Sequence, residues 1–73
     1  MALPNLDSKK VGTMLRALRG NRSQKAVADA LGISETALSI YEKGERIPRD
    51  EIKKAMADYF GVSIELLFIP QRV

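Results

Sequence analysis

The stretch GISETALSIYEKGERIP, Gly32 to Pro48, contains a short predicted helix with two unlike faces. Ser34 is a favoured N-cap and Gly44 a favoured helix end, so we predict a helix over Ser34 to Lys43. At about 100° per residue, Leu38 and Tyr41 fall on one face of this helix. A helix that only supports a fold would carry charge on the other face, whereas this one carries a small, mixed and nearly neutral set. That outer set comprises Thr36, Ser39, Ile40 and Lys43.

The outer face of this helix suits the edges of DNA bases. Hydroxyl groups donate or accept hydrogen bonds, a lysine reaches guanine or a phosphate, and an aliphatic group contacts a thymine methyl. Glu35, at the exposed amino end, can accept a hydrogen bond from a cytosine amine. The alternative is that Thr36 and Ser39 are small solvated residues without a partner. The outward position expected for Ile40 and the helix that precedes this one weigh against that alternative.

The preceding segment completes a helix-turn-helix pattern. Ser23 is a good N-cap, and Val27, Ala28 and Leu31 follow it at the spacing of one helical face. Gly32 ends this helix and is expected to adopt a left-handed backbone. Two short helices that meet at such a glycine-containing turn have the spacing of a helix-turn-helix.

The flanking segments predict three more helices, so the expected fold is all-α with five helices. The first is capped by Asp7 or Ser8 and ends at Gly20-Asn21, the fourth begins near Arg49, and the fifth follows Ser63. Their predicted inward stripes are, in chain order, Val11, Met14, Leu15 and Leu18, then Ile52, Ala55, Met56, Tyr59 and Phe60, and then Ile64, Leu67 and Phe68.

These elements divide the chain into three parts. We expect an arm over residues 1–7, a helix-turn-helix domain over residues 8–68 and a tail over residues 69–73. The arm shows no periodicity, and it is expected either to become ordered only on docking or to be disordered.

Composition narrows the classes of protein that the chain can belong to. Its 73 residues form one small domain, and the absence of Cys and His excludes disulfides and the common structural zinc sites. The remaining candidates for catalysis are scattered carboxylates, so we expect no enzyme activity, no metal and no cofactor. No apolar run approaches the length of a membrane span and no leader pattern is present, which predicts a cytoplasmic protein without membrane contact, bound to the nucleoid when it binds DNA.

The charge is unevenly distributed along the chain. The net charge is +3, and the segment from Lys9 to Lys25 contains no acidic residue. A basic half is a reasonable electrostatic footprint for nucleic acid, although it is also compatible with a solvated, charged helix face. The basic residues of this segment are Lys9, Lys10, Arg16, Arg19, Arg22 and Lys25.

Four strings carry a family resemblance: VGTMLRALR, SQKAVADALGIS, ETALSIYEKGERIP and ADYFGVSIELLF. Through them, from Val11 to Phe68, the chain resembles the lambda-repressor-like helix-turn-helix DNA-binding proteins of the Cro and XRE type. The resemblance implies a five-helix domain in which Gln24 to Leu31 is the positioning helix and Ser34 to Lys43 the recognition helix. It also implies a transcriptional regulator, expected to be a repressor, that binds operator DNA as a dimer.

The resemblance, taken with the outward faces, gives two sets of predicted DNA contacts. The residues predicted to contact bases are Glu35, Thr36, Ser39, Ile40 and Lys43. The residues predicted to contact phosphates are Arg22, Ser23, Gln24, Lys25 and Arg46.

Two departures from the family pattern affect these predictions. Only Gly20, Asn21 and Arg22 separate the strings around Leu18-Arg19 and Ser23-Gln24, about two residues fewer than is usual in the family, and this is why Arg22 is predicted as an extra phosphate contact. Glu35 is an acid where many relatives have residues that tolerate phosphate. The identity of the DNA site therefore cannot be transferred from the family.

One pair of charged residues has a structural role in the resembling family. Arg19 and Glu42 are implied to form an internal ion pair that ties the first helix to the third. Such a pair fixes geometry more reliably than it adds stability, so its expected function is to orient the recognition helix.

The remaining predictions concern partners. The last helix and the tail are the expected homodimer surface, because Phe68, Ile69 and Val73 are apolar beyond the needs of the core. No sensor domain is evident, so regulation is expected to act through concentration, proteolysis or a protein antagonist. The alternative function is a protein-binding module, such as an antitoxin or adaptor, that grips a partner with the apolar tail and Ile40.

Overall fold

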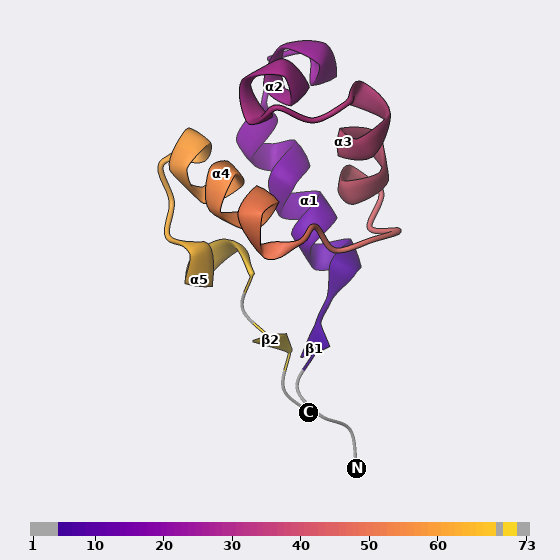
Figure 1. Ribbon diagram of the computed structural model, residues 1–73. Helices are drawn as coiled ribbons and strands as arrows, with labels where there is room; N and C mark the ends of the chain where they lie inside the picture. The colour runs from indigo at the N-terminus through magenta and orange to yellow at the C-terminus, as the bar shows by residue number, and fades with distance from the viewer. Residues whose placement is uncertain (1–4, 69, 72–73) are drawn as a thin grey trace.

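The computed structural model describes residues 5–68 and 70–71 of the chain. Five helices form its body, with α1 through the centre and the other four around it (Figure 1). The all-α prediction and the number of helices are confirmed. The helices are α1 (Ser8–Arg19), α2 (Gln24–Leu31), α3 (Glu35–Glu42), α4 (Asp50–Phe60) and α5 (Ile64–Leu67).

The helix boundaries follow from local capping chemistry. The side chain of Asp7 accepts hydrogen bonds from the backbone N–H groups of Lys9 and Lys10, at 3.0 and 3.2 Å, which makes Asp7 rather than Ser8 the N-cap of α1. Ser23, Ser34 and Ser63 cap α2, α3 and α5 in the same way, each accepting from the N–H three residues later. Short serine-capped helices with tight connections are therefore encoded locally.

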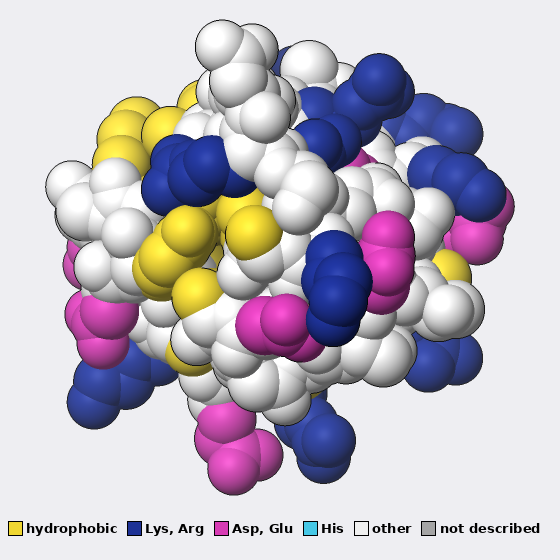
Figure 2. Space-filling model, turned by 90° about the horizontal axis from the view of Figure 1, so that it is seen from above, with side chains coloured by type: hydrophobic (Ala, Val, Ile, Leu, Met, Phe, Trp, Pro, Cys, Tyr) yellow, Lys and Arg dark blue, Asp and Glu magenta, His cyan; other side chains and the backbone are white. Residues whose placement is uncertain are grey.

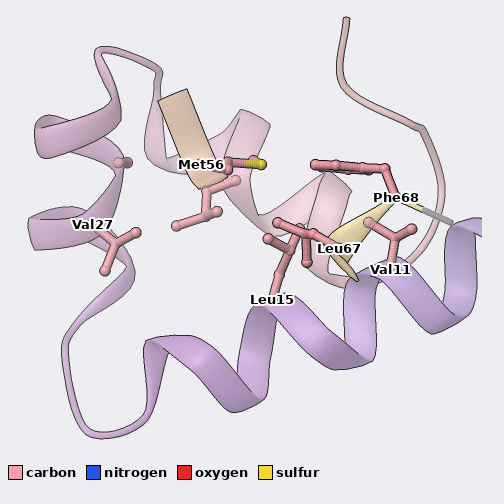
Figure 3. Close-up of a cluster of buried hydrophobic side chains, with 8 residues drawn as sticks. Val11, Leu15, Val27, Met56, Leu67 and Phe68 are labelled. Carbon is pink, nitrogen blue, oxygen red and sulfur yellow. The ribbon is translucent and has the colours of Figure 1, made fainter. Parts of the chain in front are cut away.

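The core is built from all five helices. Figure 3 shows its side chains converging from α1, α2, α4 and the end of α5. Its buried members are Val11, Leu15, Val27, Ala28, Leu38, Met56, Leu67 and Phe68. Burying a Val, Leu, Met or Phe side chain stabilises a fold by about 1.5 to 3 kcal/mol, so each of these residues except Ala28 makes a substantial contribution to the stability of a small domain.

Three predicted positions differ from what the structure contains. Met14 is 37% exposed rather than inward, because it lies at the edge of the stripe defined by Val11 and Leu15. Ile64 is 38% exposed, since α5 is a single turn that places only its carboxyl end, Leu67 and the adjoining Phe68, in the core. Phe68 was predicted both to face inward and to belong to the dimer surface, and its burial confirms the first prediction and contradicts the second.

The two ends of the described chain form a short antiparallel pair that the sequence did not predict. Strand β1 (Asn5–Leu6) pairs with β2 (Pro70–Gln71), with Asn5 opposite Gln71 and Leu6 opposite Pro70. Figure 1 shows this pair projecting from the helical body below α1 and α5. The expectation that the arm lacks order without a partner is thus wrong for residues 5–7, while residues 1–4, 69 and 72–73 lie outside the described residues.

Helices α1 and α3 approach each other closely where Gly12 lies. A Cβ atom on Gly12 would lie 2.8 Å from the carbonyl oxygen of Tyr41 and closer still to that of Glu42. Just beyond α3, the hydroxyl of Ser8 donates to the carbonyl of Gly44 at 2.7 Å. The carboxyl end of α3 is therefore fixed against α1 by close backbone contact.

Candidate nucleic-acid interface

The predicted base-contacting residues lie on the outer face of α3. Glu35, Thr36 and Lys43 are exposed, and Ser39 and Ile40 are half-buried. Ile40 therefore presents less apolar surface than the sequence suggested. Within the described part of the chain, no side-chain hydrogen bond or ion pair uses Glu35, Thr36, Ser39 or Lys43, so their polar groups are available to a ligand.

The opposite face of α3 is anchored. Leu38 is fully buried, and Glu42 is the buried charged residue of the described chain, with 3% of its side chain exposed. The predicted ion pair is present: Arg19 Nε lies 2.7 Å from Glu42 Oε2, and a second guanidinium nitrogen donates to Oε1 at 3.0 Å. This two-point geometry fixes orientation as well as distance.

The ion pair affects the protonation of its arginine. The hydrogen bond to Glu42 raises the pKa of Arg19, burial lowers it, and the charge of Glu42 raises it further, with a net upward direction. The contribution of this shift to stability is complete below the ordinary arginine pKa and is lost only as the pH rises through the raised value. The pair is thus a permanent element at physiological pH.

Helix α2 is attached to the same carboxylate. Gln24, the first residue of α2, donates from Nε2 to Glu42 Oε1 at 3.0 Å. The amino terminus of α2, which carries partial positive charge from unsatisfied N–H groups, is thereby held at a fixed position beside α3.

A polar hollow of about 220 Å³ lies where α1, α2 and α3 meet. Arg16 lines it and was missed as a site residue, although the acid-free basic segment contains it and its position three residues before Arg19 places both on one helix face. Arg16 is exposed, and no ion pair or hydrogen bond within the described residues uses its guanidinium. The hollow is lined by Arg16, Arg19, Gln24, Ser39, Glu42 and Lys43.

The predicted phosphate-contacting residues do not form one uniform set. Arg46 is exposed, and the hydroxyl of Ser23 is used as the cap of α2. Lys25 is exposed but lies 3.3 Å from Asp29 in an ion pair between consecutive turns of α2. The guanidinium of Arg22 donates to the carbonyls of Leu18 and Arg19 and to the hydroxyl of Tyr59, so it is used within the molecule.

The face at the α2 end of the molecule is not continuously positive. Figure 2 shows lysine and arginine side chains both at the edge of this face and within it, with acidic side chains between some of them and most of the hydrophobic side chains on one side. Arg16 and Lys43, which line the hollow, are exposed cations available to a ligand on this side of the molecule.

The comparison with family models decides the family. The helix-turn-helix model matches residues 14–67, well over half of the chain. The chain belongs to the helix-turn-helix family. As a member of its Cro and XRE type, it is a DNA-binding transcriptional regulator. No curated protein matches the chain.

Solved helix-turn-helix structures agree with this assignment. A P22 c2 repressor in complex with a synthetic operator has a TM-score of 0.77 and 28% identity, covering 81% of this chain and 92% of its own. The restriction-modification controller protein C.AhdI from Aeromonas hydrophila has a TM-score of 0.76 and 26% identity, covering 85% and 97%. A LexA structure from Eubacterium rectale, at 23% identity and a TM-score of 0.81 over 92% and 73%, shows the shared fold.

Two negative findings complete the description of the site. The described residues contain no group of three or more acidic, His or Cys side chains placed to hold a metal ion. Among the helices of the described chain, none combines the length and the apolar character required to pass through a lipid bilayer.

Proposed function

We propose that this helix-turn-helix protein recognises a specific operator by placing α3 in the major groove, and that its expected effect is repression. The observation that carries this proposal is the contrast between the two faces of α3. Leu38 and Glu42 fix one face to the domain, and the other face offers Glu35, Thr36, Ser39 and Lys43 with their polar groups unused by the described residues. A pre-positioned polar face is what reading base edges requires.

In this proposal base contacts and phosphate contacts are separate sets. Glu35, Thr36 and Ser39 read bases, and Ile40 contacts a thymine methyl with the part of its side chain that is exposed. Lys43 reaches a base or the backbone from the edge of the hollow. The phosphates are held by Ser23, Gln24, Lys25 and Arg46, to which the position of Arg16 in the hollow adds a further cation.

We place the proposed dimer surface on the exposed side of α5 instead of at Phe68. Ile64 and Leu66 are 38% and 51% exposed, beside a hollow of about 550 Å³ that runs between α4 and α5 and includes Ala57 and Val62 in its lining. Ile69 and Val73, named in the sequence prediction, lie outside the described residues. A twofold dimer through this surface would present two recognition helices about 34 Å apart, matching a palindromic operator.

The protein-binding alternative has lost part of its basis. It relied on an apolar tail and on Ile40, but Phe68 is buried and Ile40 is half-buried. The proposal therefore retains DNA binding as the function of residues 8–68, without enzymatic activity and with control through concentration, proteolysis or a protein antagonist.

The proposal is tested by measuring how binding depends on salt for matched variants. All variants are measured on one duplex obtained by selection from a pool of random sequences. If four to six phosphates are neutralised per dimer, log K should fall with log salt with a slope of magnitude about 4 to 5. Lys43→Met and Arg46→Met should flatten the slope. Ser39→Ala and Thr36→Val should keep the slope but weaken discrimination at one base pair by about 1 to 3 kcal/mol.

Glu51→Gln, which removes an exposed charge from α4 outside both the DNA-binding face and the hollow between α4 and α5, is the control and should change neither quantity. If no variant of α3 changes either the slope or the base preference, α3 is not the recognition helix.

A further inference from the structure

The short connection between α1 and α2 contains an arginine that is bound on several sides by the protein itself. Arg22 donates from Nη2 to the carbonyl of Leu18 at 2.8 Å and from Nε to the carbonyl of Arg19 at 3.2 Å. These carbonyls belong to the last turn of α1, whose acceptors have no partner inside the helix. The Arg22 side chain therefore completes the carboxyl end of α1, where the helix dipole also favours a cation.

The same guanidinium attaches this connection to α4. It donates from Nη1 to the hydroxyl of Tyr59 at 3.1 Å. Its central carbon, Cζ, lies 5.2 and 5.6 Å from the ring centroids of Tyr59 and Phe60. Arginine stacks on aromatic faces while its planar group still donates hydrogen bonds, which lysine cannot reproduce. The connection is thus fixed to the last turn of α4 as well as to α1.

From Arg22 the hydrogen bonds continue to the proposed DNA-binding face. The backbone carbonyl of Arg22 accepts a hydrogen bond from Arg19 Nη1 at 2.8 Å. Arg19 in turn donates from Nε and Nη2 to Glu42 on α3, and Glu42 accepts from Gln24 at the start of α2. Tyr59, Arg22, Arg19, Glu42 and Gln24 therefore form one hydrogen-bonded chain across four helices, which we call the α4–α3 chain.

We propose that the α4–α3 chain holds the amino terminus of α2 and the outer face of α3 in the geometry that binds DNA, and that Arg22 is a positioning residue within it rather than a phosphate contact. This inference rests on the proposed function. It explains how a connection shorter than the usual family pattern remains rigid, because Arg22 replaces loop length with contacts to α1 and α4. It also assigns a role in DNA binding to Tyr59, which lies on α4 and not on α2 or α3.

The test uses Tyr59→Phe, Arg22→Met and the double variant. Tyr59→Phe removes only the hydroxyl. Tyr41→Phe is its matched control, because no hydrogen bond to the Tyr41 hydroxyl exists among the described residues. All proteins are compared well below their melting transitions, with dissociation constants measured against salt on the selected duplex.

A positioning role predicts that Tyr59→Phe raises Kd by about three- to tenfold, the effect of one lost hydrogen bond. Arg22→Met, which removes three side-chain hydrogen bonds, should raise Kd at least as much, and the salt slope should be unchanged in both variants. It also predicts that the Kd of the double variant is no higher than that of the weaker-binding single variant, because both substitutions interrupt the same hydrogen-bonded chain. A phosphate contact predicts instead that Arg22→Met lowers the slope by about 0.9 per protomer, that Arg22→Lys retains it, and that Tyr59→Phe has no effect. That second pattern would overturn the proposal.

A second measurement separates this inference from the function on which it rests. In the DNA-free protein, proton–nitrogen correlation NMR spectra report the resonances of the Arg19 Nε–H group and the Gln24 side-chain amide. Tyr59→Phe should shift both resonances, although neither residue forms a hydrogen bond with Tyr59 in the described part of the chain, and Tyr41→Phe should shift neither. Unchanged resonances would show that the chain is not coupled. Shifted resonances in a protein that does not discriminate between duplexes would retain the chain and reject its proposed function in DNA binding.

Discussion

At Gly12 the backbone of α1 lies so close to the end of α3 that no side chain fits between them. A Cβ atom there would contact the carbonyl oxygens of Tyr41 and Glu42, which are backbone atoms and cannot rotate away. Gly in the middle of a helix normally costs about 0.5 to 1 kcal/mol relative to Ala. Here that cost is accepted because it allows the close approach of the two helices.

Gly12→Ala should therefore destabilise the protein despite the better helix propensity of Ala. We expect a loss of about 1 to 3 kcal/mol in the free energy of unfolding, the usual range for overpacking, measured by chemical denaturation. Thr13→Ala, at the exposed neighbouring position, is the control and should change stability by less than about 0.5 kcal/mol. A Gly12→Ala protein as stable as the parent would show that α1 and α3 are not in close contact.

Helix α3 is oriented by one carboxylate near its end. Glu42 binds Arg19 of α1 and Gln24 of α2, so a single buried side chain fixes the angle of α3 to both neighbours. Its charge is compensated by Arg19, whose side chain remains 20% exposed. Removal of Glu42 should leave that arginine partly desolvated and without its partner.

Glu42→Ala is expected to impair folding and DNA binding together. Removal of one partner from a buried pair costs about 3 to 5 kcal/mol, and the partial exposure of Arg19 places this protein at the low end. Replacement of both partners by Met should cost less than Glu42→Ala alone, since no charge is then left unpaired. Thermal melting and duplex binding are measured on the same samples, and weakened binding with unchanged melting would contradict this account of α3.

Across the whole molecule, the sequence predicted what is determined by near neighbours. The five helices, the serine caps of α2, α3 and α5 and the glycines that end α1, α2 and α4 were predicted because each depends on residues within one or two turns. The outer face of α3 and the hydrogen-bonding partner of Arg19 were also predicted, the first from helical phase and the second from family resemblance. These predictions include most of the candidate site.

The predictions that failed depend on contacts between distant segments. The pairing of β1 with β2 joins the two ends of the chain through strands too short to show alternation. The exposure of Met14 and Ile64 depends on how the helices pack rather than on the stripe of any one helix. The internal contact of Arg22 with Tyr59 was not predicted, because the two residues are 37 positions apart in the sequence.

Selection from a pool of random duplexes at physiological salt, followed by sequencing of the retained fraction, would test whether α3 reads bases. The account predicts enrichment of a short inverted repeat whose half-sites lie about one helical turn apart, and a changed consensus when Thr36→Val is selected in parallel. Enrichment of a single half-site would retain base reading and reject the dimer through α5. Retention without any enriched sequence would mean contact with phosphates alone, and it would contradict the assignment of α3 as a recognition helix.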